Sequence, residues 1–284
     1  MSGIDRILVA SDLSAKSLLA IARATMLATA HRAHLGVLRV VDPDVDDVDL
    51  EGAGVELREA LARTPAAVGA DLAVVSGTPF VEIIRHARAT DVDVVVVGYS
   101  GQDAGPRSGL GTTVERVIRK GDRPVLSVRR GPRGPYRRLV VGIDYSEHSA
   151  QALAFGSVLA PEAAVQVIHA YPLLGVRKLE GAGASHDEVA AYLRTVEVRE
   201  AERLEAYVRE RDVRGVSHHV IPGPAQTSLP ALARERRADL LVVGSRGAAG
   251  LRHVLLGSVA EHSLRDATSD VLVVRHGAAT FELP

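Results

Sequence analysis

Short apolar runs of four to seven residues recur along the chain, and most are bounded by Gly, Pro or a charged residue. Runs of this length, without strict alternation of polar and apolar positions, are typical of strands buried on both faces of a parallel sheet. The pattern predicts strands at 4–10, 35–41, 70–76, 92–97 and 125–128, and again at 139–143, 165–169, 217–221, 238–243 and 271–274.

Helical periodicity fills the segments between these runs. It predicts helices at 14–31, 55–63 and 79–89 in the first half and at 188–210 and 229–237 in the second. Ser14 is the expected N-cap of the first helix, and the acidic stretch 42–51 is expected to be a loop. This alternation predicts an α/β fold: two tandem open parallel five-stranded sheets of order 3-2-1-4-5, with helices on both faces. In that order strands 1 and 4 are neighbours, and ligands bind in the crevice beyond their carboxyl ends.

One glycine pattern follows the fourth predicted strand of each half. Two residues separate its first and second glycines, nine separate the second and third, and a hydroxyl residue follows. The pattern comprises Gly98, Gly101, Gly111 and Thr112 in the first half and Gly244, Gly247, Gly257 and Ser258 in the second. Such a long recurring spacing indicates an internal repeat. The Gly-, Pro- and Arg-rich stretch 131–137 breaks both periodicities, and we interpret it as a linker between domains 1–130 and 138–284.

These loops have the features of an anion site. Glycine lets backbone N–H groups approach a ligand closely, and the free N–H groups and dipole of a helix N-terminus favour a phosphate. Ser258 is expected to add a hydroxyl at the N-cap. Asp12 and Asp144 follow the first strand of each half, so an acid and a phosphate-type loop are expected to face one crevice, an arrangement that suits a nucleotide. The structural alternative is that the glycines only form tight turns, and that Asp12, Asp144, Thr112 and Ser258 only cap helices.

Composition and charge narrow the class of protein. Aromatic residues make up 3% of the chain and hydrophobic residues 46%, so Val, Leu, Ile and Ala must form the cores. The net charge of −1 gives no reason to expect nucleic acid as a partner, and the absence of Cys removes disulfides and thiolate sites. No apolar run approaches the roughly 20 residues of a membrane helix, and we expect a cytoplasmic protein without a membrane partner. Helix 188–210, with pairs such as Glu200 and Arg203, is interpreted as a solvated charged face.

Several chemistries are disfavoured by the motifs. Neither loop is a Walker P-loop, because no Lys followed by Ser or Thr comes after its last Gly, and this disfavours fast phosphoryl transfer. A hydrolase built on Ser258 and His253 is disfavoured because no G-x-S-x-G elbow is present. His169 is interpreted as a packed or hydrogen-bonded histidine near the crevice. Mg²⁺ carried by nucleotide phosphates is the metal we expect.

The two loops, the Asp after the first strand and the Val-Leu-Ser-Val and Val-Leu-Val-Val strand endings make the chain similar to the universal stress protein family in its tandem two-domain form. In the nucleotide-binding branch of that family, the glycine motif contacts the ribose and phosphates of ATP. The Asp and the end of the second strand contact the adenosine part. The resemblance implies a first site of Asp12, Val40, Gly98, Gly101, Gly111, Thr112 and Thr113, and a second of Asp144, Ala170, Gly244, Ser245, Arg246, Gly247, Gly257, Ser258 and Val259.

The resemblance also implies a function. It indicates an ATP-binding regulatory stress-response protein with one site per half, whose halves pack as a pseudo-dimer, often through strand 5. Mg²⁺ with the ATP, an unidentified protein partner and further dimerisation are implied with it. Arg246 in the second loop and Asp103 in the first predict tighter binding by the second site, because an acid disfavours a triphosphate. Two alternatives stay open: a slow ATPase or nucleotidyl-transfer enzyme, with Asp12 or Asp144 positioning water or metal, and a structural stress protein without nucleotide.

Overall fold

The computed structural model of the chain describes residues 3–43, 49–63, 69–99, 112–173, 175, 179, 181–211, 215–247 and 256–275. The first half contains β1 (Arg6–Ala10), α1 (Ala15–His31), β2 (His34–Val41), α2 (Leu50–Ala62), β3 (Asp71–Ser76), α3 (Pro79–Ala89), β4 (Val94–Gly98), α4 (Thr112–Lys120) and β5 (Val125–Val128). The second half contains β6 (Arg138–Gly142), α5 (Glu147–Leu159), β7 (Ala164–Tyr171), α7 (His186–Glu210), β8 (Val216–Pro222), α8 (Ala225–Glu235), β9 (Leu240–Gly244), α9 (Ser258–Asp266) and β10 (Asp270–Val274).

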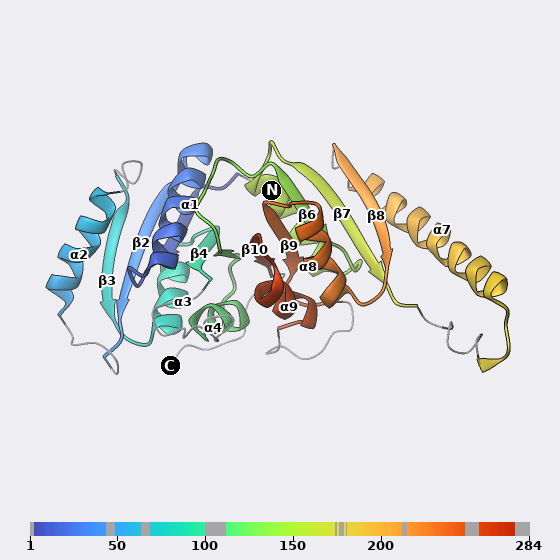
Figure 1. Cartoon of the computed structure of the whole chain (residues 1–284). Coiled ribbons are helices and arrows are strands. Elements are labelled where there is room, and N and C mark those ends of the chain that lie inside the picture. Colours follow the sequence, from blue (N-terminus) through green and yellow to red (C-terminus); the bar gives the residue numbers. More distant parts are fainter. Residues whose placement is uncertain are drawn as a thin grey trace.

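The strands lie side by side across the whole molecule, as Figure 1 shows. Their order is β3-β2-β1-β4-β5-β10-β9-β6-β7-β8, so each half has the predicted parallel order 3-2-1-4-5. The two predicted sheets are joined through their fifth strands, as the resemblance implies, because β5 and β10 pair antiparallel and Leu126 lies opposite Leu272. An isolated strand edge leaves backbone N–H and C=O groups unpaired. Pairing the two edges satisfies these groups and makes one ten-stranded sheet.

Each face of the sheet has one continuous hydrophobic layer. On one face, α1, α2, α5 and α7 contribute buried residues such as Ile21, Leu57, Leu153 and Leu204. On the other face, α3, α4, α8 and α9 contribute residues such as Ile83, Val117, Leu229 and Leu264. Both layers contain residues of both halves, so the halves share their cores. The side chains are almost all aliphatic, as the low aromatic content predicts.

Helices α2 and α8 begin several residues earlier than their patterns predict. Helix α2 begins at Leu50, within the stretch expected to be a loop, because the Asp49 side chain caps it and accepts from the Gly52 N–H at 2.8 Å. Its glycines weaken the helical pattern in the sequence, although packing of Leu57 against the sheet sustains the helix. Helix α8 begins at Ala225 rather than at residue 229, because its first turn is polar and has no apolar period.

The amino ends of the strands carry a repeated carboxylate bridge that the sequence analysis did not predict. The Asp93 carboxylate accepts from the backbone N–H groups of Asp5 and Arg6 at 2.7 and 2.8 Å. Asp239 accepts in the same way from Arg137 and Arg138, at 2.9 Å each. Each aspartate therefore ties the start of the fourth strand to the start of the first. These bridges lie at the end of the sheet opposite the crevice.

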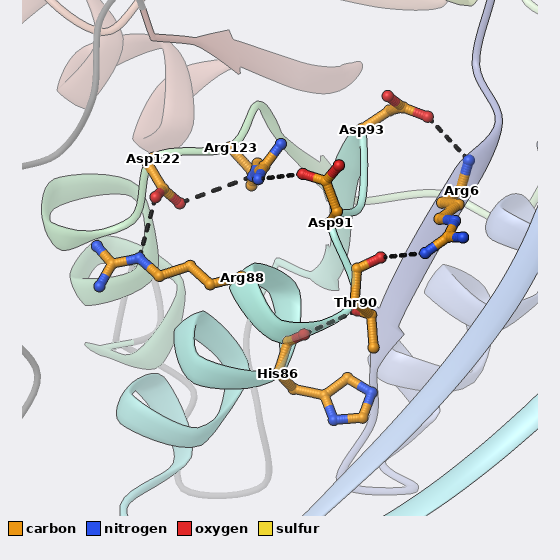
Figure 2. A network of polar contacts seen from close by, with 8 residues as sticks. All are labelled: Arg6, His86, Arg88, Thr90, Asp91, Asp93, Asp122 and Arg123. Carbon is orange, nitrogen blue, oxygen red and sulfur yellow. Dashed lines mark hydrogen bonds and ion pairs between the residues drawn. The ribbon is translucent and has the colours of Figure 1, made fainter.

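Ion pairs surround the first of these bridges, as Figure 2 shows. Arg88 binds Asp122 at 3.0 Å, and Arg123 binds Asp91 at 2.7 Å. Arg6 donates to the Thr90 carbonyl at 2.8 Å. The network therefore joins the end of α3 to the turn that follows α4.

The predicted linker packs into the junction between the halves. Tyr136 is 3% exposed, and its hydroxyl donates to the Asp270 carboxylate at 2.7 Å. Asp270 also accepts from the Arg129 N–H at 2.8 Å, and its Oδ2 lies 3.4 Å from Nε of Arg23 in α1. Burial raises the pKa of Asp270, and these hydrogen bonds and the Arg23 charge oppose the rise. One buried carboxylate thus connects α1, the linker and β10.

Gly98 and Gly244 allow the fourth strand of each half to touch a helix. A Cβ at Gly98 would lie 2.9 Å from the Lys16 carbonyl carbon, and a Cβ at Gly244 would lie 2.9 Å from that of His148. Because these neighbours are backbone atoms, they cannot move aside cheaply. We expect Gly98→Ala and Gly244→Ala each to reduce the free energy of unfolding by about 1–3 kcal/mol in urea titrations. Gly181→Ala is the control, because its Cβ would meet nothing within 4 Å; an equal loss there would contradict the packing role.

Candidate nucleotide site

The turn after the first strand has the same conformation in both halves. Leu13 and Tyr145 have φ of 60° and 65°, in the left-handed region that side chains other than glycine seldom adopt. Ser14 and Ser146 then cap α1 and α5, and each hydroxyl accepts from the N–H three residues further on, at 3.3 and 3.2 Å. The expected capping role of Ser14 is therefore confirmed.

Both aspartates support these capping serines. Oδ1 of Asp12 accepts from the Ser14 N–H at 3.0 Å, and Oδ1 of Asp144 accepts from the N–H and the hydroxyl of Ser146 at 3.1 and 2.5 Å. Oδ2 of Asp144 faces the glycine loop, because a Cβ at Gly247 would lie 2.8 Å from it. A side-chain carbon does not normally lie this close to a carboxylate oxygen. Asp144 can therefore approach the loop because residue 247 is a glycine. The two lips of the second crevice therefore meet at Asp144 and Gly247.

The glycine loop is closed by backbone contacts. The Ser245 N–H donates to the Val274 carbonyl at 2.7 Å, and the Gly257 N–H donates to the Ser245 carbonyl at 2.9 Å. A Cβ at Gly257 would lie 3.2 Å from the Arg246 Cα, so both ends of the glycine motif pack against each other. The Ser245 side chain is buried, and its hydroxyl has no hydrogen-bond partner among the residues that the structure describes. The hydroxyls of Ser127 and Ser263 are in the same state, so this feature is not specific to the loop.

Helix α9 starts one residue earlier than the N-cap prediction for Ser258 requires. Gly257 is the N-cap and makes no side-chain hydrogen bond, whereas Ser258 is the first helical residue and is exposed. Glycine is an accepted N-cap, which explains the shift. The first N–H groups of a helix, here those of Ser258 and Val259, have no acceptor within the helix. An N-terminus without a side-chain cap is suited to an anion.

The other end of the second crevice lies at the end of β7. Ala170 is half-buried there, beside His169. Nδ1 of His169 lies 2.8 Å from the Ile143 carbonyl oxygen, to which it donates, and the ring centre lies 4.5 Å from that of Tyr145. The interpretation of His169 as a hydrogen-bonded histidine is confirmed. Its Nε2 lies 3.9 Å from the Glu200 carboxylate.

Glu200 corrects the interpretation of its helix as a solvated face. It is 9% exposed, and Arg203 lies 4.0 Å from its carboxylate, so the predicted pair is present but half of it is buried. The apolar stripe of α7, with Leu204 and Tyr207, places Glu200 on the sheet side. The Arg203 guanidinium lies 4.0 Å over the Tyr145 ring. Burial raises the pKa of Tyr145 to about 12, so its hydroxyl stays protonated near neutral pH.

Tyr145 and Arg203 are residues of this region that the sequence analysis did not select as site residues. Tyr145 carries a usable signal, because it lies between Asp144 and Ser146 in a tripeptide that matches Asp12–Ser14. Arg203 has no comparable local signal, since only the packing of α7 brings it over the ring.

The structure shows part of the first crevice. Asp12 and Val40 are half-buried at the ends of β1 and β2, Gly98 ends β4, and Thr112 begins α4, followed by Thr113. Gly101 and Gly111 lie outside the described residues. The halves differ beside Val40, because Arg39, which binds Glu56 at 2.6 Å, occupies the strand position that His169 occupies in the second half.

Two kinds of feature do not occur in the described part of the chain. No three His, Asp or Glu side chains lie close enough to hold a metal ion there. No helix in those ranges is long and apolar enough to cross a membrane.

The fold is a tandem repeat of one doubly wound α/β unit, and the turn after the first strand has the same conformation in both copies. A model of the universal stress protein family matches residues 3–129 and 135–275. A universal stress protein of Mycobacterium tuberculosis is 30% identical over 228 residues, which cover 76% of this chain and 74% of that protein. One of Mycolicibacterium smegmatis is 29% identical over 288 aligned positions, covering 95% of this chain and 96% of the relative.

Solved structures show the same fold. A universal stress protein from Archaeoglobus fulgidus has a TM-score of 0.66 at 21% identity, and the match covers 96% of this chain and 98% of that chain. With two segments matching the family model in succession, the chain belongs to the universal stress protein family in its tandem form.

Proposed function

We propose that the chain is a regulatory module that binds ATP in each half. The observation that carries the proposal is the approach of Asp144 to Gly247, with a Cβ position only 2.8 Å from the carboxylate. Beside this contact lies the start of α9, whose N-cap Gly257 makes no side-chain hydrogen bond. A strand end, a glycine turn and a free helix N-terminus around one crevice fit a nucleotide with its phosphates at the helix.

Each residue set has a distinct task in this proposal. The turn Gly244–Gly247, Gly257 and the first N–H groups of α9 bind phosphates, and Arg246 adds a positive charge. Asp144 and the backbone at Ala170 bind the adenosine part. In the first half Asp12, Val40, the glycines Gly98, Gly101 and Gly111, and Thr112 and Thr113 at the start of α4 are proposed to do the same. Mg²⁺ would supply charge neutralisation at the phosphate oxygens.

The module is proposed to act by binding rather than by turnover. Neither loop has the lysine that contacts β- and γ-phosphates in P-loop enzymes. ATP would order the glycine loops and change the surface that a protein partner contacts. The enzyme alternative makes a different prediction: multiple-turnover phosphate release that Asp144→Ala abolishes while ATP binding is retained.

The proposal is tested first on purified protein. Denaturing the purified chain should release adenine nucleotide, or a stripped sample should take up Mg-ATP and retain it through gel filtration. A chain that neither carries nor takes up adenine nucleotide contradicts the proposal and leaves the structural alternative. Asp144→Ala should lower retention by the second half about 10-fold or more, because a ligand contact worth roughly 1.4 kcal/mol changes affinity tenfold.

A further inference from the structure

Arg129 and Arg275 occupy equivalent positions next to the two glycine loops. Each directly follows strand 5 of its half, β5 or β10. The last carbonyl of each strand accepts from the first residue after the fourth strand: Val128 from Tyr99 at 2.9 Å, and Val274 from Ser245 at 2.7 Å. Each arginine is therefore one residue away from the bond that holds the glycine loop of its own half.

The side chains of these arginines cross to the opposite half. Nη1 of Arg275 donates to the carbonyls of Arg119 and Gly121 at 2.9 and 2.7 Å, at the end of α4. Arg129 donates to the Leu264 carbonyl in the last turn of α9. The last carbonyls of a helix have no partner within it, and a cation there is favourable. Each half thus caps the helix whose N-terminus forms the phosphate end of the other half's crevice.

Both arginines lie close to residues that belong to or adjoin the glycine loops. The Arg129 guanidinium lies 3.6 Å over the ring of Tyr99, the first residue after Gly98. Burial lowers the pKa of Arg275, and the nearby positive charge of Arg246 in the second loop lowers it further. A phosphate beside Arg246 would offset that repulsion and favour the contact of Arg275 with α4.

The end of α4 is itself part of a connected network. Asp122, directly after Gly121, is bound by Arg88 of α3 at 3.0 Å (Figure 2). The Asp122 charge attracts Arg275 and the Arg88 charge repels it. Arg275 therefore contacts an end of α4 that the Arg88–Asp122 ion pair also holds to α3. A displacement of Arg275 would act on the helix through this contact.

We propose that Arg129 and Arg275 are positioning residues that couple the two nucleotide sites, each transmitting occupancy of its own glycine loop to the helix at the other half's site. The proposal rests on the proposed function. Because coupling between sites is reciprocal, ATP in either half should raise the affinity of the other by the same factor, and typical couplings are about 5- to 150-fold.

The test compares two dissociation constants for the first site by calorimetric titration of the full chain with Mg-ATP. The first constant is measured in the Gly247→Val variant, whose second site is blocked. The other is the weaker of the two dissociation constants of the unsubstituted chain, in which ATP already fills the second site when the first site binds. We expect the filled second site to tighten the first at least about fivefold. The same two constants are then measured in the Arg275→Met variant and in the Arg275→Met, Gly247→Val double variant, where they should be equal. Arg275→Lys should restore part of the difference between the two constants.

A merely structural arginine would weaken both constants and leave their ratio unchanged, which would overturn the proposal. Equal dissociation constants in the two chains that keep Arg275 would also overturn the proposal. This outcome can be observed even if the Arg275→Met variant does not fold. Arg209→Met, at an exposed arginine paired with Glu205 on α7, should leave the ratio at its original value. Absence of any ATP binding would instead contradict the proposed function itself, so the two failures are distinguishable.

Discussion

A Gly247→Val chain is expected to bind one equivalent of ATP where the unsubstituted chain binds two. The new Cβ would lie 2.8 Å from Oδ2 of Asp144, and the two methyl groups of valine would enter the crevice between loop and strand. The carboxylate would have to move away from the position proposed to bind the nucleotide. We expect the affinity of the second half to fall at least about 100-fold, or roughly 2.7 kcal/mol. Equilibrium dialysis with labelled ATP measures the number of sites directly.

The fold should survive this change, because Gly247 is exposed and does not pack against a backbone segment of the core. Its thermal midpoint should therefore stay within a few degrees of that of the original chain. Gly181→Val, at a glycine with open space around it, is the matched control and should retain both sites. Two sites of unchanged affinity in the Gly247→Val chain would show that the glycine turn does not bind the phosphates.

Asp270→Ala is expected to give the largest loss of stability. The substitution leaves the Arg23 guanidinium buried with its carboxylate partner removed, and it also removes the acceptor of the Tyr136 hydroxyl and of the Arg129 N–H. Removing one member of a buried ion pair costs about 3–5 kcal/mol, because the remaining charge is left uncompensated. Urea unfolding should show a lower midpoint, and exchange of the linker amides should accelerate.

Asp270→Asn separates the charge from the hydrogen bonds. Asparagine keeps an acceptor oxygen in nearly the same volume, so its cost should be clearly smaller than that of alanine. Equal stabilities of the alanine variant and the original chain would contradict the view that this carboxylate holds the junction together.

Much of the fold follows from local signals in the sequence. The apolar runs locate every strand within a few residues, most clearly for central strands such as β4 and β10, which are buried along their whole length. Ser14 marks the start of α1 because its hydroxyl satisfies a helix N–H. The union of the sheets has no such local signal, because the pairing of Leu126 with Leu272 joins segments far apart in the chain.

The candidate site was predicted in outline but not in its contacts. Spacing and resemblance select Asp144 and Gly247, and the structure brings them together. Spacing and resemblance do not reveal that Gly244 packs closely against the backbone of His148. The requirement for glycine at this position depends on the contact between β9 and α5, which the sequence alone does not show. Glu200 was misassigned to the solvent because a charged residue on an apolar stripe looks like a surface residue until its partners are seen.

Calorimetric titration of the full-length chain with Mg-ATP tests the central claim most directly, because its stoichiometry counts the occupied crevices. The account predicts two equivalents of ATP per chain, with the tighter one assigned to the half that contains Asp144 and Arg246. No measurable binding of ATP at protein concentrations up to the millimolar range would contradict it.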